Sequence, residues 1–226
     1  SESTIGNNDY WVIKIDSLGN IQWQNNIAGL YDDLLYKIHP TIDGYILAGS
    51  SSSNISGDKT ENSNGSYDYW VIKLDLIGNI VWQNTIGGNL DDGQNTIDIK
   101  QTSDGGYILG GSSNSVISGD KTENNNGGYD YWIIKLDNAG TIQWQNTIGG
   151  DNNDYLTSII QTFDGGYFVG GFSYSNISGD KTEATIGLVG AGDYWVIKLT
   201  SLGDIEWQNT IGGDDNDNLS CVKQTY

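Results

Sequence analysis

Short apolar and aromatic runs, separated by glycine, aspartate and asparagine, recur along the whole chain, and none of them shows the 3.6-residue period of a helix. The clearest run, residues 68–75, reads Asp-Tyr-Trp-Val-Ile-Lys-Leu-Asp and is rich in the aromatic and β-branched residues that strands prefer. Residues 80–84, Ile-Val-Trp-Gln-Asn, form a second such run. Asp75 and Gly78 supply a turn between them, because aspartate bonds to its own backbone and glycine accepts a positive φ. The pattern therefore predicts a β-hairpin.

The same hairpin pattern occurs four times. Its copies begin at Asp9, Asp68, Asp130 and Asp193, about 60 residues apart, and self-similarity at such a period indicates a repeat architecture. The rest of each repeat predicts two more strands joined by a tight Asp-Gly turn. Each repeat is therefore predicted to hold four short antiparallel strands.

Four-stranded sheets repeated at this length predict an all-β protein of β-propeller type, with blades of about 60 residues. A β-sandwich repeat array is the alternative, but it would not require four near-identical hairpins in register. On the propeller prediction, residues 1–226 form a single β-propeller segment. Its units are a partial blade at 9–28, blades at 33–86, 94–148 and 156–211, and a partial blade at 218–226.

The two ends of the chain are expected to leave a ring incomplete. Two outer strands at 10–27 and one inner strand at 219–226 lie outside the whole blades, and the counterpart of residues 107–111 is missing between them. Unpaired sheet edges invite pairing with another chain. We therefore expect either a longer array with blades on both sides, or an assembly in which another copy fills the gap.

The amino-acid composition limits the kinds of molecule that this chain is expected to bind. The chain has a net charge of −19, and all ten of its Lys and Arg residues are lysines, so nucleic acid and anionic membranes are poor partners. No apolar run approaches the roughly 18 residues of a membrane span, so no membrane insertion is expected. Cys221 is the single cysteine and excludes an intrachain disulfide. A soluble surface that attracts cations is the expected result.

A Ser-Gly-Asp-Lys-Thr-Glu motif occurs three times in the long polar loops. Calcium prefers several carboxylate and carbonyl oxygens from a flexible loop, so Ca²⁺ is the cofactor that this motif suggests. Its candidate metal ligands are Asp58, Glu61, Asp120, Glu123, Asp180 and Glu183. In the alternative interpretation, aspartate and threonine side chains bond to the loop backbone and the lysine pairs with a carboxylate.

The linkers between repeats are also acidic, and they are expected on the same rim as the long loops. Their carboxylates are either further metal ligands or solvated turn residues, and they are Asp91, Asp92, Asp151, Asp154, Asp214, Asp215 and Asp217.

The eight tryptophans occupy two repeated positions, one in each strand of the hairpin. A fixed register favours packing between blades over stacking on sugar rings. The first set is Trp11, Trp70, Trp132 and Trp195; the second, expected to be largely buried, is Trp23, Trp82, Trp144 and Trp207. No catalytic residue is assigned, because His39 is the only histidine and Cys221 falls in a predicted inner strand.

The alternating motifs Asp-Gly-Gly-Tyr-Ile-x-x-Gly-Gly and Asp-Tyr-Trp-x-x-Lys-Leu-Asp-x-x-Gly-Asn-Ile-x-Trp-Gln resemble those of secreted, surface-displayed repeat proteins of the Bacteroidota. Many such proteins end in a type IX secretion sorting domain, which this sequence does not include. Residues 156–166 are similar to the inner strand and turn of WD-repeat blades. Residues 73–82 resemble the tryptophan-docking hairpin of quinoprotein dehydrogenases, whose cofactor groups are not recognisable here.

The resemblance implies an extracellular or cell-surface location. The expected function is a non-enzymatic structural or adhesive surface module of a larger repeat protein. Its expected partners are flanking blades of the same chain, other protein chains or surface glycans. A carbohydrate-binding propeller is the first alternative, and a polysaccharide-active enzyme with a carboxylate pair is the second.

Overall fold

The computed structural model describes residues 5–188 and 190–225. The regular secondary structure of these residues consists of β-strands alone. The predicted all-β class is therefore confirmed. Within the described residues no helix has the length and apolar character needed to cross a membrane.

The strands form one two-stranded sheet and three four-stranded sheets, in which all neighbours are antiparallel. The two-stranded sheet is β1 (Tyr10–Ile15) and β2 (Ile21–Ile27). The four-stranded sheets are β3 (Asp33–Thr41), β4 (Gly44–Ser51), β5 (Asp68–Asp75) and β6 (Ile80–Ile86); β7 (Asp92–Gln101), β8 (Tyr107–Ser113), β9 (Asp130–Leu136) and β10 (Ile142–Ile148); and β11 (Asp154–Gln161), β12 (Tyr167–Ser173), β13 (Asp193–Leu199) and β14 (Ile205–Ile211).

The predicted hairpins form, and the turn between β5 and β6 shows why. The Asp75 carboxylate accepts hydrogen bonds from the amides of Ile77 at 2.9 Å and Asn79 at 2.8 Å. Gly78 has a φ of 92°, a region that side chains other than glycine rarely adopt. Sequence-local chemistry therefore fixes this turn.

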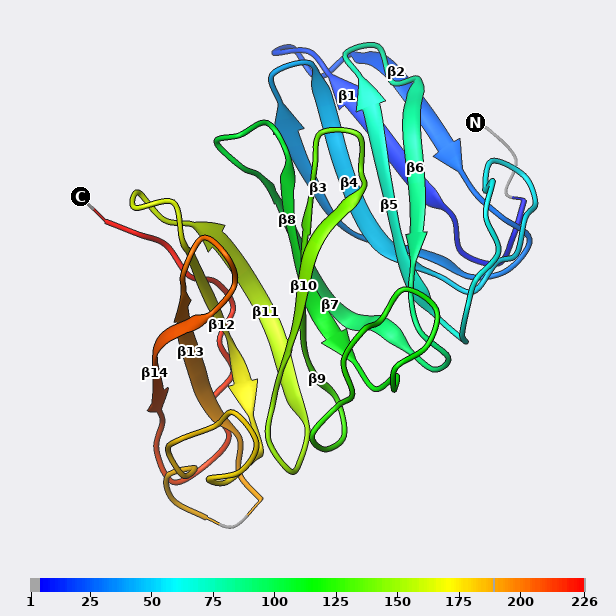
Figure 1. The fold of residues 1–226 in the computed structure, drawn as a ribbon. Coiled ribbons are helices and arrows are strands. Elements are labelled where there is room, and N and C mark those ends of the chain that lie inside the picture. Colours follow the sequence, from blue (N-terminus) through cyan, green and yellow to red (C-terminus); the bar gives the residue numbers. More distant parts are fainter. Residues whose placement is uncertain (1–4, 189, 226) are drawn as a thin grey trace.

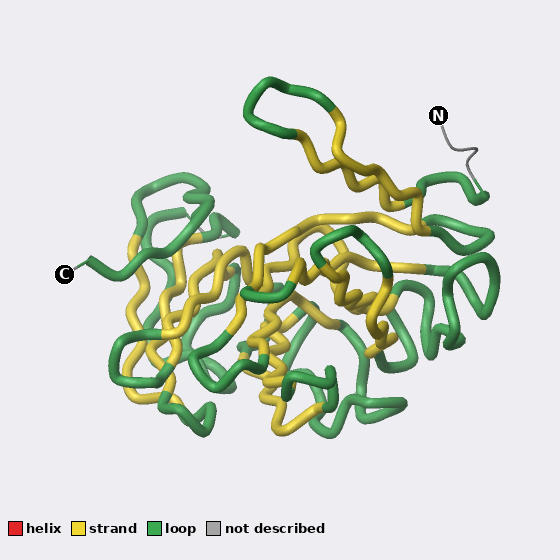
Figure 2. The backbone as a smooth tube through the Cα atoms, turned by 90° about the horizontal axis from the view of Figure 1, so that it is seen from above, coloured by secondary structure: helices red, strands yellow, loops and turns green. Residues whose placement is uncertain are grey.

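The sheets follow one another in an open row. Figure 1 shows them side by side, with the two ends of the chain at opposite ends of the row. Seen from above, the β1–β2 hairpin near the N-terminus stands out from the remaining strands (Figure 2). The described sheets do not close into a ring.

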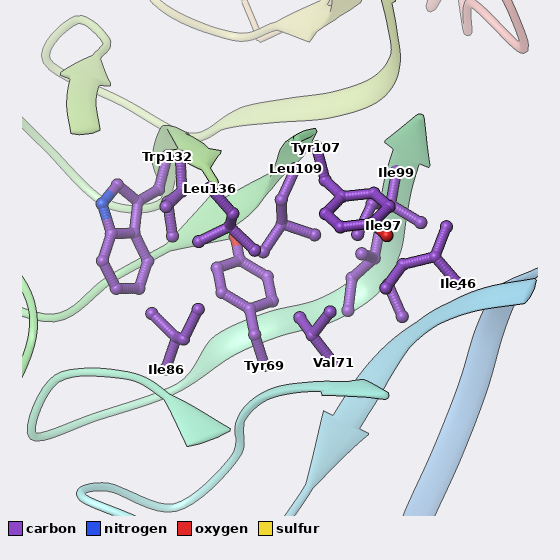
Figure 3. Close-up of a cluster of buried hydrophobic side chains, with 12 residues drawn as sticks. Ile46, Tyr69, Val71, Ile86, Ile97, Ile99, Tyr107, Leu109, Trp132 and Leu136 are labelled. Carbon is purple, nitrogen blue, oxygen red and sulfur yellow. The ribbon is translucent and has the colours of Figure 1, made fainter. Parts of the chain in front are cut away.

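A hydrophobic core lies between each pair of successive sheets. The core between the β3–β6 and β7–β10 sheets contains Tyr69 and Val71 from one side and Trp132 and Leu136 from the other (Figure 3). Tyr69 and Trp132 are fully buried, with ring centroids 5.3 Å apart. Equivalent cores lie on either side of this one. The apolar faces of the strands therefore join the sheets to one another.

The prediction of burial for the second set of tryptophans is wrong for Trp207, which is 49% exposed. Trp23, Trp82 and Trp144 are partly buried and pack against the cores between the sheets. These residues lie on the outer strand of each sheet, at the edge of the core. The fully buried tryptophans belong to the first set and are Trp70, Trp132 and Trp195.

Residues 212–225 contain no strand, although an inner strand was expected at 219–226, of which residue 226 lies outside the described residues. The segment nevertheless packs where an inner strand would, since Val222 is buried and the Gln224 side chain accepts a hydrogen bond from the Phe163 amide at 2.9 Å. In the complete sheets an inner strand pairs with the strand that follows it. Among the described residues, no strand pairs with this segment.

Candidate functional site

The repeated acidic loop folds back on itself at its motif. In the first copy, Ser56 and Lys59 exchange backbone hydrogen bonds of 3.2 and 2.9 Å. Gly57 sits at the bend with a φ of 54°, and a Cβ there would lie 2.3 Å from the carbonyl oxygen of Ala28. The same turn recurs in the other two copies. Each loop therefore packs directly on the linker that precedes its inner strand, and the expected meeting of loops and linkers is confirmed.

The motif aspartates bind backbone amides of the linkers. The carboxylate of Asp58 accepts a hydrogen bond from Ala28 N, that of Asp120 from Gly87 N, and that of Asp180 from Gly149 N, each at 3.1 Å. Asp120 and Asp180 each accept a further bond from an asparagine of the preceding loop. These carboxylates therefore tie the loop of one repeat to its neighbour.

The motif glutamates bind backbone amides of the outer strands. Glu61, Glu123 and Glu183 accept hydrogen bonds from Thr85 N, Thr147 N and Thr210 N, each at 2.6 Å. Bonding of side chains to backbone therefore describes this geometry, as in the alternative, but the glutamate takes the part that was expected of threonine, and the amides belong to linkers and outer strands. Among the described residues, no group of three or more His, Cys, Asp or Glu side chains is placed to hold a metal ion. The calcium site stays a prediction.

The motif lysines are buried beside tryptophan rings. Lys59, Lys121 and Lys181 are each 1% exposed, with their ammonium groups 5.4, 5.0 and 5.6 Å from the centroids of the buried tryptophans. Each donates a hydrogen bond to a hydroxyl oxygen, at 3.0, 2.6 and 3.1 Å. Burial lowers the pKa of Lys59 and of Lys121 to about 8, although carboxylates nearby oppose the shift. The lysine therefore packs on an aromatic ring and bonds to a hydroxyl, in place of the expected ion pair.

Two of the linker carboxylates are not solvated turn residues. Asp92 and Asp154 are fully buried and accept hydrogen bonds from Gly88 N at 2.6 Å and Gly150 N at 2.7 Å. Burial raises the pKa of both. Their carboxylates therefore satisfy linker amides from inside the protein. By contrast, Asp151, Asp214 and Asp215 are exposed as expected.

A third set of carboxylates lies at the first residue of the hairpins, and these carboxylates are buried as well. Asp68 and Asp130 are fully buried, and each accepts a backbone hydrogen bond from an asparagine four residues earlier. Desolvation raises the pKa of Asp68 to about 6 and that of Asp130 to about 7. Buried carboxylates and buried lysines thus form a polar layer beneath each loop.

One polar cluster is not repeated, and it lies on the inner strands. Asp98 of β7 is buried, and its carboxylate pairs with Lys100 of the same strand and with Lys37 of β3, the latter at 3.4 Å. The other oxygen accepts hydrogen bonds from the Ser158 hydroxyl at 3.3 Å and from Ile159 N at 3.1 Å, both on β11. Asp98 therefore joins the inner strands of three successive sheets.

The cluster was not predicted, although the sequence contains a signal for it. An aspartate in the middle of a predicted apolar inner strand stands where the other repeats have Lys37 and Ser158. His39 lies beside the cluster, where burial and then the charge of Lys100 lower its pKa. Because both carboxylate oxygens of Asp98 already have ion-pair or hydrogen-bond partners, this cluster is suited to holding the strands together.

The last sheet carries an open pocket of about 300 Å³. Its walls include Phe168, Lys198, Trp207 and Lys223. The rings of Phe168 and Trp207 lie 5.6 Å apart, and Lys198 forms ion pairs with Asp164 and Glu206 at 3.0 and 2.9 Å. An aromatic wall with polar groups around it is a surface that can accept another molecule.

Comparison with models of protein families gave no match to this chain, and no curated protein matched it with significance.

Proposed function

We propose that this chain is a non-enzymatic structural or adhesive module of a larger repeat protein, built from blades of β-propeller type. Three observations support the blade assignment. The four-stranded sheets have the same order of strands, they are antiparallel, and they stand side by side with an apolar core between each pair (Figure 1).

The observation that carries the structural role is the use of the repeated charged groups. In all three loops the glutamate and the aspartate bind backbone amides at the same distances, and the lysine is buried against a tryptophan. Charged hydrogen bonds of this kind stabilise a fold by about 1.5–3 kcal/mol each. Side chains that are needed for each loop to fold are not free to act on a substrate.

Location and partners follow from the resemblance and from the charge. Repeat proteins with these motifs are secreted and displayed on the cell surface, often by type IX secretion, so we place this chain outside the cell. The net charge of −19 supports a soluble, cation-attracting surface. Flanking blades and other protein chains are the proposed partners of this structural module, and nucleic acid is not among them. Surface glycans are partners only in the carbohydrate-binding alternative.

A carbohydrate-binding module is the second candidate, and the pocket beside Trp207 favours it. Half of this indole is exposed next to Phe168, and exposed aromatic rings stack on sugar rings. A polysaccharide-active enzyme ranks third.

A glycan array distinguishes the candidates. We expect the purified chain to retain no soluble glycan, because a structural module needs no sugar site. Retention that disappears in Trp207→Ala, and persists in the control Trp11→Ala at the opposite end of the row, would establish the carbohydrate-binding alternative. Turnover of a polysaccharide that one carboxylate substitution abolishes would establish the enzyme.

A further inference from the structure

Within the chain, the second-set tryptophan of each repeat covers a glycine turn in the next repeat. A Cβ added to Gly78 would lie 2.9 Å from the Trp23 ring, and one added to Gly140 would lie 2.8 Å from the Trp82 ring. A Cβ added to Gly203 would lie 3.0 Å from the Trp144 ring. Each tryptophan therefore lies against a turn that has room only for glycine.

Two further contacts accompany each tryptophan. An asparagine two residues later donates a hydrogen bond to the carbonyl of the covered glycine, from Asn84 to Gly140 at 2.7 Å and from Asn146 to Gly203 at 2.8 Å. The indole also packs edge-on against a tyrosine of the next repeat, as Trp82 does on Tyr107 with ring centroids 5.8 Å apart. The contact between repeats is thus a defined interface that occurs three times.

At the two ends of the row, each half of this interface has no counterpart among the described residues. Gly19 has a φ of 85°, like the covered glycines, but an added Cβ would find no heavy atom within 4 Å. Trp207 is 49% exposed, and Asn209 beside it is exposed. In the described part of the chain, the N-terminal hairpin therefore has an acceptor turn, a glycine turn of the kind that a tryptophan covers, with no tryptophan on it. The last sheet has the corresponding tryptophan with no such turn beneath it.

The apolar face around Gly19 is also uncovered. Trp11, Ile13 and Ile15 are 64%, 40% and 59% exposed. Their counterparts in β5 are Trp70, Ile72 and Leu74, which are all fully buried because the preceding hairpin covers them. This face therefore has the composition of a sheet-to-sheet interface but lies in solvent.

We infer that two copies of this chain associate head to tail, with Trp207 of one copy covering the Gly19 turn of a second copy. The inference rests on the proposed role as a repeat module, since it continues between copies the interface that joins repeats within one. Because the two surfaces differ, the contact is heterologous, and further copies can add to either end of the assembly.

Sedimentation velocity on the purified chain tests this association. The average mass should rise above that of the monomer between about 1 μM and 1 mM, the range of moderate affinities. Trp207→Ala and Trp11→Glu should each remain monomeric over this range. The control Ile42→Ser, at a 94% exposed turn position outside both surfaces, should associate like the wild type.

Mixing the two monomeric variants gives the sharpest result. Trp207→Ala keeps an intact acceptor and Trp11→Glu keeps an intact tryptophan, so the mixture should form dimers that grow no further. Gly19→Asn is a second acceptor variant, because asparagine tolerates a positive φ while its side chain occupies the place of the ring. It should also stay monomeric with an unchanged unfolding midpoint.

Three results would overturn the proposal: a wild-type chain that stays monomeric throughout, a Trp207→Ala variant that still associates, or a mixture that forms no dimer. Glycan retention on the array would instead count against the proposed structural function, and it would leave the association data unchanged. The two failures are therefore distinguishable.

Discussion

Trp132→Ala should lower the free energy of unfolding by about 3–5 kcal/mol, the range for large aromatic truncations in cores. The indole is fully buried between two sheets, its Nε1 donates a hydrogen bond to Gln145 at 3.0 Å, and Lys121 lies over its ring. Its loss would leave a cavity and remove the aromatic partner of a buried ammonium. Equilibrium unfolding in urea, followed by far-ultraviolet circular dichroism, measures the effect.

Trp11 is the matched control, because it occupies the same position in the repeat but is 64% exposed. Trp11→Ala should cost less than about 1 kcal/mol, as surface substitutions do. Equal costs for the two variants would show that Trp132 is not buried between two sheets.

Asp98→Ala should cost about 2–4 kcal/mol, since removing one partner of a buried ionic cluster leaves the other charges uncompensated. The upper end of that range is reduced because the Lys37 side chain is 42% exposed and can turn to solvent. The amide of Ile159 would also lose its acceptor inside the structure. The same urea titration applies.

Two further variants serve as controls for this prediction. Asp98→Asn keeps an acceptor for Ile159 N but loses the charge, so its cost should be intermediate. Glu206→Gln weakens an ion pair of Lys198 whose carboxylate is 43% exposed, and it should cost less than about 1 kcal/mol. If Asp98→Ala proved as mild as Glu206→Gln, Asp98 would not be joining the three inner strands.

The hairpins were predictable because their signals are local. The Asp75 turn and the aromatic strand of residues 68–75 are recognised from a few adjacent residues, and repetition makes each assignment stronger. The packing of most tryptophans between the sheets was predictable too, but the exposure of Trp11 and Trp207 was not. Trp11 and Trp132 are identical by sequence position, and only the presence of a neighbouring sheet makes one exposed and the other buried.

The loop motif could be interpreted in two ways because both use the same residues. A carboxylate at position 123 suits a calcium ligand and suits a bond to Thr147 N, and only the fold of the loop places that amide within 2.6 Å. Asp98 was missed for a related reason, since its partners lie on strands about 60 residues away in each direction. Contacts between repeats depend on how the sheets stack, which no single repeat encodes.

The structural role of the loop carboxylates can be tested at a single peptide bond, the one that follows Lys121. Trypsin needs access to this lysine, which is 1% exposed in the folded loop. Glu123→Ala removes the acceptor of Thr147 N, a charged hydrogen bond worth about 1.5–3 kcal/mol, so local opening should become at least about tenfold more frequent. The loops that keep Glu61 and Glu183 serve as controls within the same molecule.

Mass spectrometry of a tryptic time course, run both in a calcium chelator and in millimolar calcium, is the most direct measurement. We expect the wild type to be protected after Lys121 in both conditions. Glu123→Ala should be cut there at least about tenfold faster in both, while cleavage after Lys59 and Lys181 stays slow. A wild-type loop that is cut rapidly in the chelator and protected only by calcium would show that the loop carboxylates bind metal and do not hold the loop by themselves.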